Sequence, residues 1–355
     1  MKFSALNFPC SGCGASLVYS PELGKMTCLF CMSEADVTPS TLHTAADDYL
    51  ATIATQTQTE EKVIEKEVSC KKCGGSYTFS SKLFAGHCSY CDTPAVIDCI
   101  QEIKPKALLP FAISQKKAQE KFKIWVGSRW FAPNAFKEYL DESKKLIGYY
   151  FPYWTYDTQT VSSYNGYRGD AYYVTVYKRV GGEDKEVEER RIEWTPANGV
   201  IDVSFEDMTV GASHTIERSR LDEIEPWSTQ ELLDFDPRYI SGFEAEEYSL
   251  KLQDGFDIAK RKMESTIQYK VKADIGGDEQ RVDYIDTQYN DIGYKAVLLP
   301  VWVASFVWND KTYNYAINAR TGKIVGERPY SYVKIAFAIL GAVVVAGVIW
   351  YVTRP

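Results

Sequence analysis

The spacing of the cysteines constrains this chain more than any other feature. The pattern Cys-x-x-Cys, fourteen residues, Cys-x-x-Cys occurs twice, and the second copy repeats the first at an offset of 60 positions. Two short knuckles of this kind can bring four thiolates to one tetrahedral metal ion, with zinc–sulfur bonds of about 2.3 Å. The predicted ligands are Cys10, Cys13, Cys28 and Cys31 for one ion, and Cys70, Cys73, Cys88 and Cys91 for the other.

Zinc is the metal that this ligand set favours. Four thiolates leave no open coordination position, so the sequence predicts two structural Zn²⁺ sites and no catalytic or other cofactor-binding residue. Rubredoxin-like iron and redox disulfides stay open as alternatives. Residues 1–9 lack the apolar run of a secretory signal, which favours reduced thiols and therefore metal. Gly14 and Gly74 follow a cysteine where a positive φ can turn backbone amides toward sulfur.

The cysteine repeat also sets the domain boundaries. We expect a small zinc ribbon at residues 1–37 (ribbon 1) and a second at 68–101 (ribbon 2). The segment between them, 38–67, is rich in Thr, Gln and acidic residues and is interpreted as a flexible linker. The remaining 102–331 have the composition of a folded domain in the cytoplasm.

Residues 102–331 show both helical and strand patterns, so the predicted fold class is α+β with a central antiparallel sheet. Apolar residues at helical spacing predict helices over 114–126, with Ser114 as the N-cap, and over 244–267. Aromatic and β-branched runs predict a meander of short strands at 149–160, 171–180, 187–194, 200–205, 297–307 and 312–317. Both halves run from a helix into a Pro-x-Trp strand, which suggests a weak internal duplication.

A single stretch near the C-terminus is apolar enough to span a bilayer. Residues 335–352 carry no charge, and a helix of this length is close to the roughly 30 Å hydrocarbon core. We therefore expect a transmembrane helix over 332–353, with a buried core helix as the alternative. Four basic residues precede it and Arg354 follows, so the N-terminal domains are expected in the cytoplasm and the C-terminus outside, in a single-pass cell-membrane protein.

Nothing in the sequence indicates an enzyme. Walker-type phosphate loops, GxSxG elbows and HExxH pairs are absent. The acidic stretch 217–236, with Trp227 in its midst, reads as a solvated face or as a surface for a basic partner.

Nucleic acid is an improbable ligand of the ribbons on charge grounds. Residues 1–100 contain 7 Lys plus Arg against 11 Asp plus Glu, and each ZnCys4 centre adds roughly −2. A basic stretch does follow, and a solvated helix face, anionic lipid headgroups and nucleic acid all compete as its explanation. Its members are Lys104, Lys106, Lys116, Lys117, Lys121, Lys123 and Arg129, with Trp125 and Trp130 nearby.

The twin ribbons, the run Leu109, Pro110, Phe111 and the Thr321, Gly322, Lys323 segment before the anchor together resemble a known family. It is the bacterial family of membrane-anchored double zinc-ribbon proteins, whose ribbon is of the transcription-factor-B type and which is often mislabelled as similar to a primosomal helicase. The resemblance implies an association with phage-shock-like envelope-stress systems. It also implies that such proteins recruit coiled-coil and virion-core-like partners to the membrane.

The function expected from sequence is therefore a non-enzymatic, membrane-anchored adaptor that recruits cytoplasmic partner proteins in an envelope-stress response. The alternative is a membrane-tethered nucleic-acid-binding regulator that uses the ribbons and residues 104–129. The lipid bilayer is an expected partner in either case. Ala338, Ala342 and Ala346 form a small-residue ridge at a spacing of four, which allows the chain to pair with a second copy.

Overall fold

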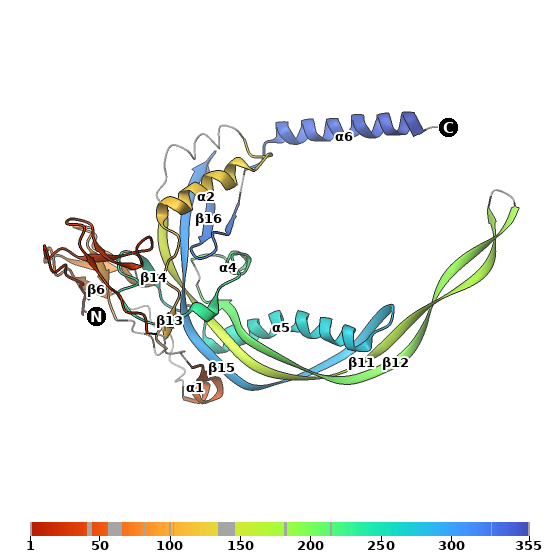
Figure 1. Ribbon diagram of the computed structural model, residues 1–355, viewed down its shortest axis with the longest axis horizontal. Coiled ribbons are helices and arrows are strands. Elements are labelled where there is room, and N and C mark those ends of the chain that lie inside the picture. The colour runs from red at the N-terminus through yellow and green to blue at the C-terminus, as the bar shows by residue number, and fades with distance from the viewer. Residues whose placement is uncertain are drawn as a thin grey trace.

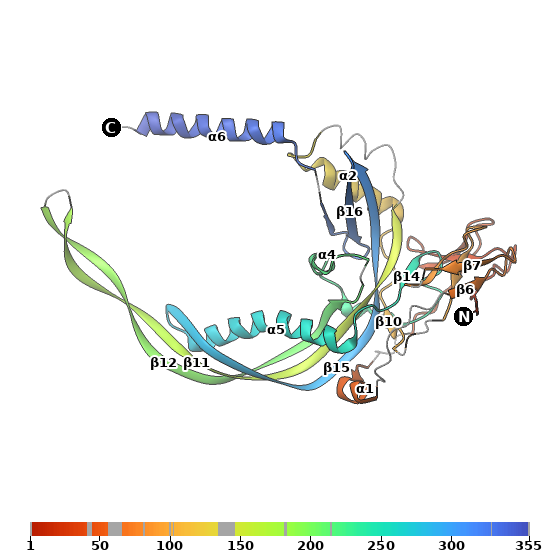
Figure 2. The ribbon, with the colours of Figure 1, turned by 180° about the vertical axis from the view of Figure 1, so that it is seen from behind.

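The computed structural model describes residues 2–40, 45–55, 66–80, 82–98, 101, 103–133, 146–180, 183–213, 215–327 and 329–353. The two ribbons lie at one side of a twisted β-sheet body, a long β-arm extends from the other side, and an apolar helix projects from the body (Figures 1 and 2). The expected mixture of α and β structure is confirmed.

The two ribbons are built from short strands and contact each other. Strand β1 pairs in parallel with β6, and Leu6 forms an isolated bridge with Val96. Ribbon 1 contains β1 (Lys2–Ser4), β2 (Leu17–Ser20), β3 (Lys25–Cys28) and β4 (Glu34–Ala35), and ribbon 2 contains β6 (Lys66–Ser69), β7 (Ser76–Phe79), β8 (Leu83–His87) and β9 (Pro94–Val96). The N-terminal strand of one ribbon therefore belongs to the sheet of the other.

The segment between the ribbons contains packed structure. Strand β5 (Asp47–Asp48) pairs with the body, and α1 (Tyr49–Thr55) follows it. The Tyr49 ring is 6% exposed and lies 4.9 Å from the ring of Phe256. The expectation of a flexible linker over 38–67 is wrong for residues 45–55, because one buried aromatic side chain holds this short helix on the body. Residues 56–65 lie outside the described part of the chain.

The body is an eleven-stranded sheet that also takes in β5, β8 and β9. Most of its strand pairs are antiparallel, as expected, but β10 pairs with β15 and β14 with β11 in parallel. Its own strands are β10 (Ala107–Leu108), β11 (Ile147–Val180), β12 (Glu183–Gly211), β13 (Leu233–Asp234), β14 (Glu244–Glu246), β15 (Glu279–Trp308), β16 (Lys311–Asn318) and β17 (Ile324–Gly326).

Three very long strands replace the expected meander. The four short strands expected between 149 and 205 are parts of β11 and β12, and the strand expected at 297–307 is the end of β15. Glycine allows a close backbone approach inside these strands: a Cβ on Gly166 would lie 2.1 Å from the Arg281 carbonyl oxygen. Pro196 is tolerated because β12 is an edge strand, which needs no outward N–H donor.

Strands β11 and β12 continue beyond β15 as a two-stranded ribbon, here called the distal arm (residues 170–180 and 183–193). The last pair that β11 makes with β15 is Gly169 with Glu279. Eleven further residues at about 3.3 Å each give the distal arm a length of about 36 Å. Its surface carries polar contacts, with Lys178 bonded to Glu189 at 2.9 Å and the Tyr177 hydroxyl to Glu186 at 2.6 Å.

Helix α5 (Leu252–Ile275) covers the proximal part of these strands (Figure 1). It begins and ends eight residues later than expected, because residues 244–246 form β14 instead. Its buried residues recur every three or four positions, from Leu252 and Phe256 to Val271 and Ile275. The helix ends at Gly276, whose φ of 67° suits glycine.

The remaining helices are short or match the sequence prediction. Helix α2 (Gln115–Gly127) is confirmed with its N-cap, since the Ser114 hydroxyl accepts the Lys117 N–H at 3.4 Å. Helix α4 (Arg218–Glu223) and the 3-10 turn η1 (Thr229–Glu231) lie in the acidic stretch. Helix α6 (Tyr332–Thr353) has 22 residues, a mean hydropathy of 2.5 and no buried residue, so it is long and apolar enough to cross a membrane. The suggested internal duplication of the body is not shown by this fold.

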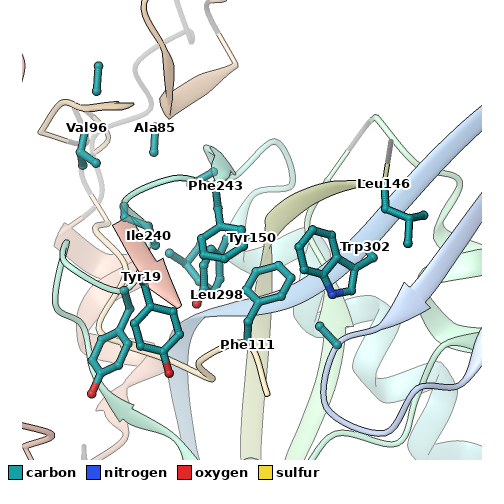
Figure 3. Packing of buried hydrophobic residues seen from close by; sticks show 14 of the residues in the cluster. Tyr19, Ala85, Val96, Phe111, Leu146, Tyr150, Ile240, Phe243, Leu298 and Trp302 are labelled. Carbon is teal, nitrogen blue, oxygen red and sulfur yellow. The ribbon is translucent and has the colours of Figure 1, made fainter. Parts of the chain in front are cut away.

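One hydrophobic cluster runs from ribbon 1 into the body (Figure 3). The ring of Tyr19 from β2 lies edge-on to Tyr239, with centroids 5.1 Å apart. Phe243 on the same segment stacks on Phe111 at 4.1 Å, and Phe111 also contacts Trp302 on β15. Ribbon 1 is therefore docked on the body through aromatic contacts.

Candidate metal centres

The first knuckle of each ribbon is a tight turn fixed by the same two backbone hydrogen bonds. In ribbon 1, Cys10 N–H donates to the Ala15 carbonyl at 2.7 Å and Gly14 N–H to the Cys10 carbonyl at 2.9 Å. In ribbon 2 the bonds that join Cys70, Gly75 and Gly74 are both 2.9 Å. Gly14 and Gly74 have φ of 75° and 73°, as expected for these positions.

The second knuckle of each ribbon repeats the same bonds without glycine. Cys28 N–H donates to the Ser33 carbonyl, and Cys88 N–H to the Thr93 carbonyl, both at 2.9 Å. Met32 and Asp92 hold the left-handed position, with φ of 60° and 55°. Four knuckles thus place their cysteines with one backbone geometry.

The eight cysteines gather into two groups, each with its four sulfur atoms within 4.8 Å of one another. The Sγ atoms of Cys10 and Cys31 are 3.5 Å apart, and those of Cys13 and Cys28 are 3.4 Å apart. In ribbon 2 the corresponding separations, Cys70–Cys91 and Cys73–Cys88, are 3.7 and 3.9 Å. A tetrahedron with bonds of about 2.3 Å has sulfur–sulfur edges of about 3.8 Å, so each group fits one Zn²⁺.

A hydroxyl group two residues after the last cysteine supports each sulfur set. The Ser33 Oγ lies 2.9 Å from the sulfurs of both Cys10 and Cys31, and the Thr93 Oγ1 lies 3.1 Å from Cys91. In the metal-free thiols this contact lowers the pKa of Cys10 to about 6, with further help from backbone amides, and Thr93 likewise lowers the pKa of Cys91 to about 6. Both hydroxyls therefore favour the thiolate that a metal needs.

Sequence reasoning missed these two hydroxyl residues, although a signal for them existed. Ser33 and Thr93 stand 60 positions apart, the same offset as the cysteines. A hydroxyl residue at equivalent places in both copies is the pattern that would have found them.

Ribbon 2 is fastened to the body through a buried ion pair. The Lys66 Nζ lies 2.8 Å from Glu247 Oε1, with the two side chains 1% and 10% exposed, and it also donates to the Leu83 carbonyl at 2.9 Å. Strand β14 pairs with β8 beside it. The second metal group thus sits within a few residues of the sheet edge.

The two second knuckles present different surfaces. In ribbon 1, Leu29, Phe30 and Met32 are 69%, 72% and 70% exposed. Ribbon 2 has Ser89, Tyr90 and Asp92 in the equivalent places. The Lys72 ammonium, from the first knuckle of ribbon 2, lies 5.0 Å from the centre of the Phe30 ring, so both ribbons contribute to this surface.

The acidic stretch 217–236 that the sequence raised is part of the packed body. Trp227 in the acidic stretch is buried against Tyr153, and Lys262 bonds Asp222 and Glu225 at 2.6 and 3.2 Å. These carboxylates are paired within the body, so the stretch is not an open acidic face. Among the described residues, the two cysteine groups are the places where three or more metal-ligating side chains converge.

Comparison with known proteins adds one relative. The chain is 30% identical over 237 residues to "Uncharacterized protein YdjG" of Bacillus subtilis (strain 168). The match covers 66% of this chain and 66% of the relative, just under two thirds of each. No family model matches the chain, and no solved structure matches it.

Proposed function

We propose that this chain is a membrane-anchored, non-enzymatic adaptor whose ribbons hold two Zn²⁺ ions and present a docking surface to cytoplasmic proteins. The observation that carries the proposal is the exposed apolar knuckle of ribbon 1, formed by Leu29, Phe30 and Met32 and here called the apolar knuckle. It stands on a metal site whose four sulfurs leave no position for a substrate.

The two ribbons provide an internal comparison. Their cysteines and knuckle bonds are equivalent, so metal binding does not require a particular side chain at the three other places of the second knuckle, two between its cysteines and one directly after them. Ribbon 2 carries polar residues at two of these three places, whereas ribbon 1 exposes three large apolar side chains. Phe and Met are enriched in the buried centres of protein interfaces, and a contiguous exposed apolar patch is otherwise a liability.

The partner class comes from the family resemblance. Proteins of phage-shock-like systems, a coiled-coil protein and a virion-core-like protein, are the proposed partners, in an envelope-stress response. The adaptor would hold them at the cytoplasmic face of the cell membrane through α6.

The proposed topology places α6 across the bilayer with the ribbons and body in the cytoplasm. Arg320, Lys323, Arg328 and Lys334 lie near the start of the helix, and Arg354 is the basic residue after it. The cytoplasm also keeps cysteine thiols reduced and able to bind zinc.

The course of the distal arm sets a condition on this topology. Helix α6 and the distal arm leave the body in the same direction (Figure 1). The arm carries ion pairs such as Lys178–Glu189, and charged side chains are costly in the hydrocarbon core. The proposed topology therefore requires that α6 and the distal arm diverge in the bilayer, so that the arm remains outside the hydrocarbon.

A surface swap between the ribbons tests the adaptor function. The triple variant Leu29→Ser, Phe30→Tyr, Met32→Asp gives the apolar knuckle the side chains of ribbon 2 and leaves all eight cysteines in place. Full-length wild-type and variant proteins are purified from membranes, and co-purifying coiled-coil and virion-core-like proteins are quantified by mass spectrometry. We expect recovery of the partner to fall at least about tenfold, the loss typical of a disrupted hot spot of about 1.4 kcal/mol or more.

The matched control is Leu23→Ser, which removes a half-exposed leucine of ribbon 1 outside the apolar knuckle. It should retain both the metal and the partner. The proposal is contradicted if the triple variant keeps its zinc and its partner recovery, or if the control loses the partner equally.

A further inference from the structure

We infer that one exposed face of α2 and the turn after this helix form a second membrane contact, which lies against an anionic cytoplasmic leaflet beside the start of α6. This surface, here called the interfacial patch, consists of Ile124, Trp130 and Phe131 with Lys117 and Lys121. The inference rests on the proposed membrane topology of α6.

The apolar members of the interfacial patch are exposed although the neighbouring residues of the same helix form a core. Ile124 and Trp130 are 73% and 74% exposed, and Phe131 is 37% exposed. By contrast, Phe122 and Val126 are buried, and Phe122 lies 4.9 Å from the ring of Tyr315. Helix α2 therefore packs on the body through other residues, and the exposed Ile124 and Trp130 do not contribute to that packing.

Two hydrogen bonds join this turn to the start of α6. The Ser331 N–H donates to the Phe131 carbonyl at 2.8 Å, and the Lys334 ammonium donates to the Ala132 carbonyl at 2.9 Å. Tyr330 and Tyr332, 52% and 85% exposed, flank the same point in the chain. When α6 enters a bilayer, the residues beside its first turn are held at the depth of the headgroups, where Trp and Tyr are enriched.

The charge of α2 fits an anionic lipid surface. Lys117, Lys121 and Ile124 follow one another at spacings of four and three, so they lie on one exposed face of the helix. Lys116 and Lys123 flank this face, and Glu120 is the acidic residue of the helix. A lysine near an anionic surface strengthens binding about fivefold, and an apolar side chain between lysines matches the boundary between headgroups and acyl chains.

Lipid explains this combination better than nucleic acid does. A phosphate-tracking surface needs cations, and it gains nothing from an exposed isoleucine beside a transmembrane segment. The Trp125 ring, which could stack on a base, is occupied by Tyr315 at 5.6 Å and by the Arg129 guanidinium at 4.5 Å. The exposed Trp130 directly precedes Phe131, whose carbonyl accepts the Ser331 N–H at the start of α6.

Fluorescence quenching in vesicles tests the inference on the full chain. A bimane probe is attached to Ile124→Cys in a Cys99→Ser background, with zinc bound so that the eight ligand thiols are protected. The protein is reconstituted into vesicles of phosphatidylcholine alone, or of equal parts phosphatidylcholine and phosphatidylglycerol, that contain a shallow nitroxide lipid. Matched probes are placed at the exposed Ala112, before the other end of α2, and at Val345 in the middle of α6.

We expect strong quenching at residue 124, weak quenching at residue 112, and a gain at 124 when phosphatidylglycerol is present. The double variant Lys117→Gln, Lys121→Gln should remove most of that gain, because each lysine strengthens the binding of the interfacial patch to the anionic surface about fivefold. Equal quenching at residues 112 and 124 would overturn the inference, as would a response at residue 124 to a double-stranded oligonucleotide and not to anionic vesicles. Failure of a deep nitroxide lipid to quench the probe at residue 345 would instead refute the anchor itself, so the two failures are distinguishable.

Discussion

Replacing Ser33 by alanine should weaken the metal site of ribbon 1 without unfolding the body. The Ser33 hydroxyl lies 2.9 Å from the sulfurs of both Cys10 and Cys31, so its loss removes a polar contact from two of the four ligands. Removing a hydrogen-bond partner of a metal ligand typically costs 10–100-fold in metal affinity. Because Cys10 keeps the Gly12 N–H at 3.4 Å, we expect the middle of that range, about 30-fold.

The equivalent substitution in ribbon 2 should cause a smaller loss of zinc affinity. The Thr93 hydroxyl contacts one sulfur at 3.1 Å, so Thr93→Ala should cost about 10-fold. The conservative exchanges Ser33→Thr and Thr93→Ser keep a hydroxyl at each place and should restore most of the affinity. The loss of zinc affinity should therefore be largest for Ser33→Ala, smaller for Thr93→Ala and smallest for the conservative variants, because the Ser33 oxygen contacts two sulfurs and the Thr93 oxygen contacts one.

The dependence on pH has a defined sign. Ser33, together with the backbone amides of Cys13 and Gly12, lowers the pKa of Cys10 from 9.0 to about 6, so this stabilisation is fully present above pH 9 and is lost as the pH falls through about 6. Ser33→Ala raises this pKa, and metal release on acidification should therefore begin at a higher pH than in the wild type.

Competition with a colorimetric zinc chelator measures these affinities on the full-length protein as two release phases. One phase should shift in Ser33→Ala and the other in Thr93→Ala. If neither alanine variant shifts a phase, or if the conservative variants lose as much affinity as the alanine variants, the hydroxyls do not support the metal.

Two further changes test the turn geometry and the docking of ribbon 2. Gly74→Ala should destabilise zinc-loaded ribbon 2 by about 1 kcal/mol through its φ of 73° alone, since nothing lies within 4 Å of the added Cβ. The control is Gly127→Ala in α2, where φ is not positive, and a Gly74 variant with the thermal stability of the wild type would contradict the argument. Lys66→Met should lower the free energy of chemical unfolding by about 3–5 kcal/mol, because it leaves Glu247 buried and unpaired. The double variant Lys66→Met, Glu247→Leu should recover most of this loss. A single variant as stable as the wild type would show that the pair is not buried in solution.

The sequence predicted the parts of this molecule that depend on local chemistry. Cysteine spacing located both groups of four cysteines, the Ser114 cap located α2, and the charge-free run located α6. These features need no knowledge of distant contacts, because a knuckle, a cap and an apolar helix are each encoded within a few turns of chain.

The long strands could not be predicted, because their continuity depends on tertiary contacts. Thr158, Thr160 and Ser162 face the covered side of β11 and are buried, although small polar residues signal no core in a sequence. Their hydroxyls are satisfied by partners far along the chain, such as the Asn290 carbonyl for Thr158 at 2.8 Å. Gly166 suits the close approach of β15, since a Cβ there would meet the Arg281 backbone. The docking of residues 45–55 escaped notice for the same reason, since it depends on Tyr49 meeting a helix 200 residues away.

The direct test of the account is the metal content and coordination of the purified full-length protein. Native mass spectrometry combined with zinc K-edge absorption should find two Zn²⁺ ions per chain, each bound by four sulfurs at about 2.3 Å. Iron in place of zinc, fewer than two metal ions per chain, or a first shell that contains oxygen or nitrogen would contradict the two closed thiolate centres on which the adaptor rests.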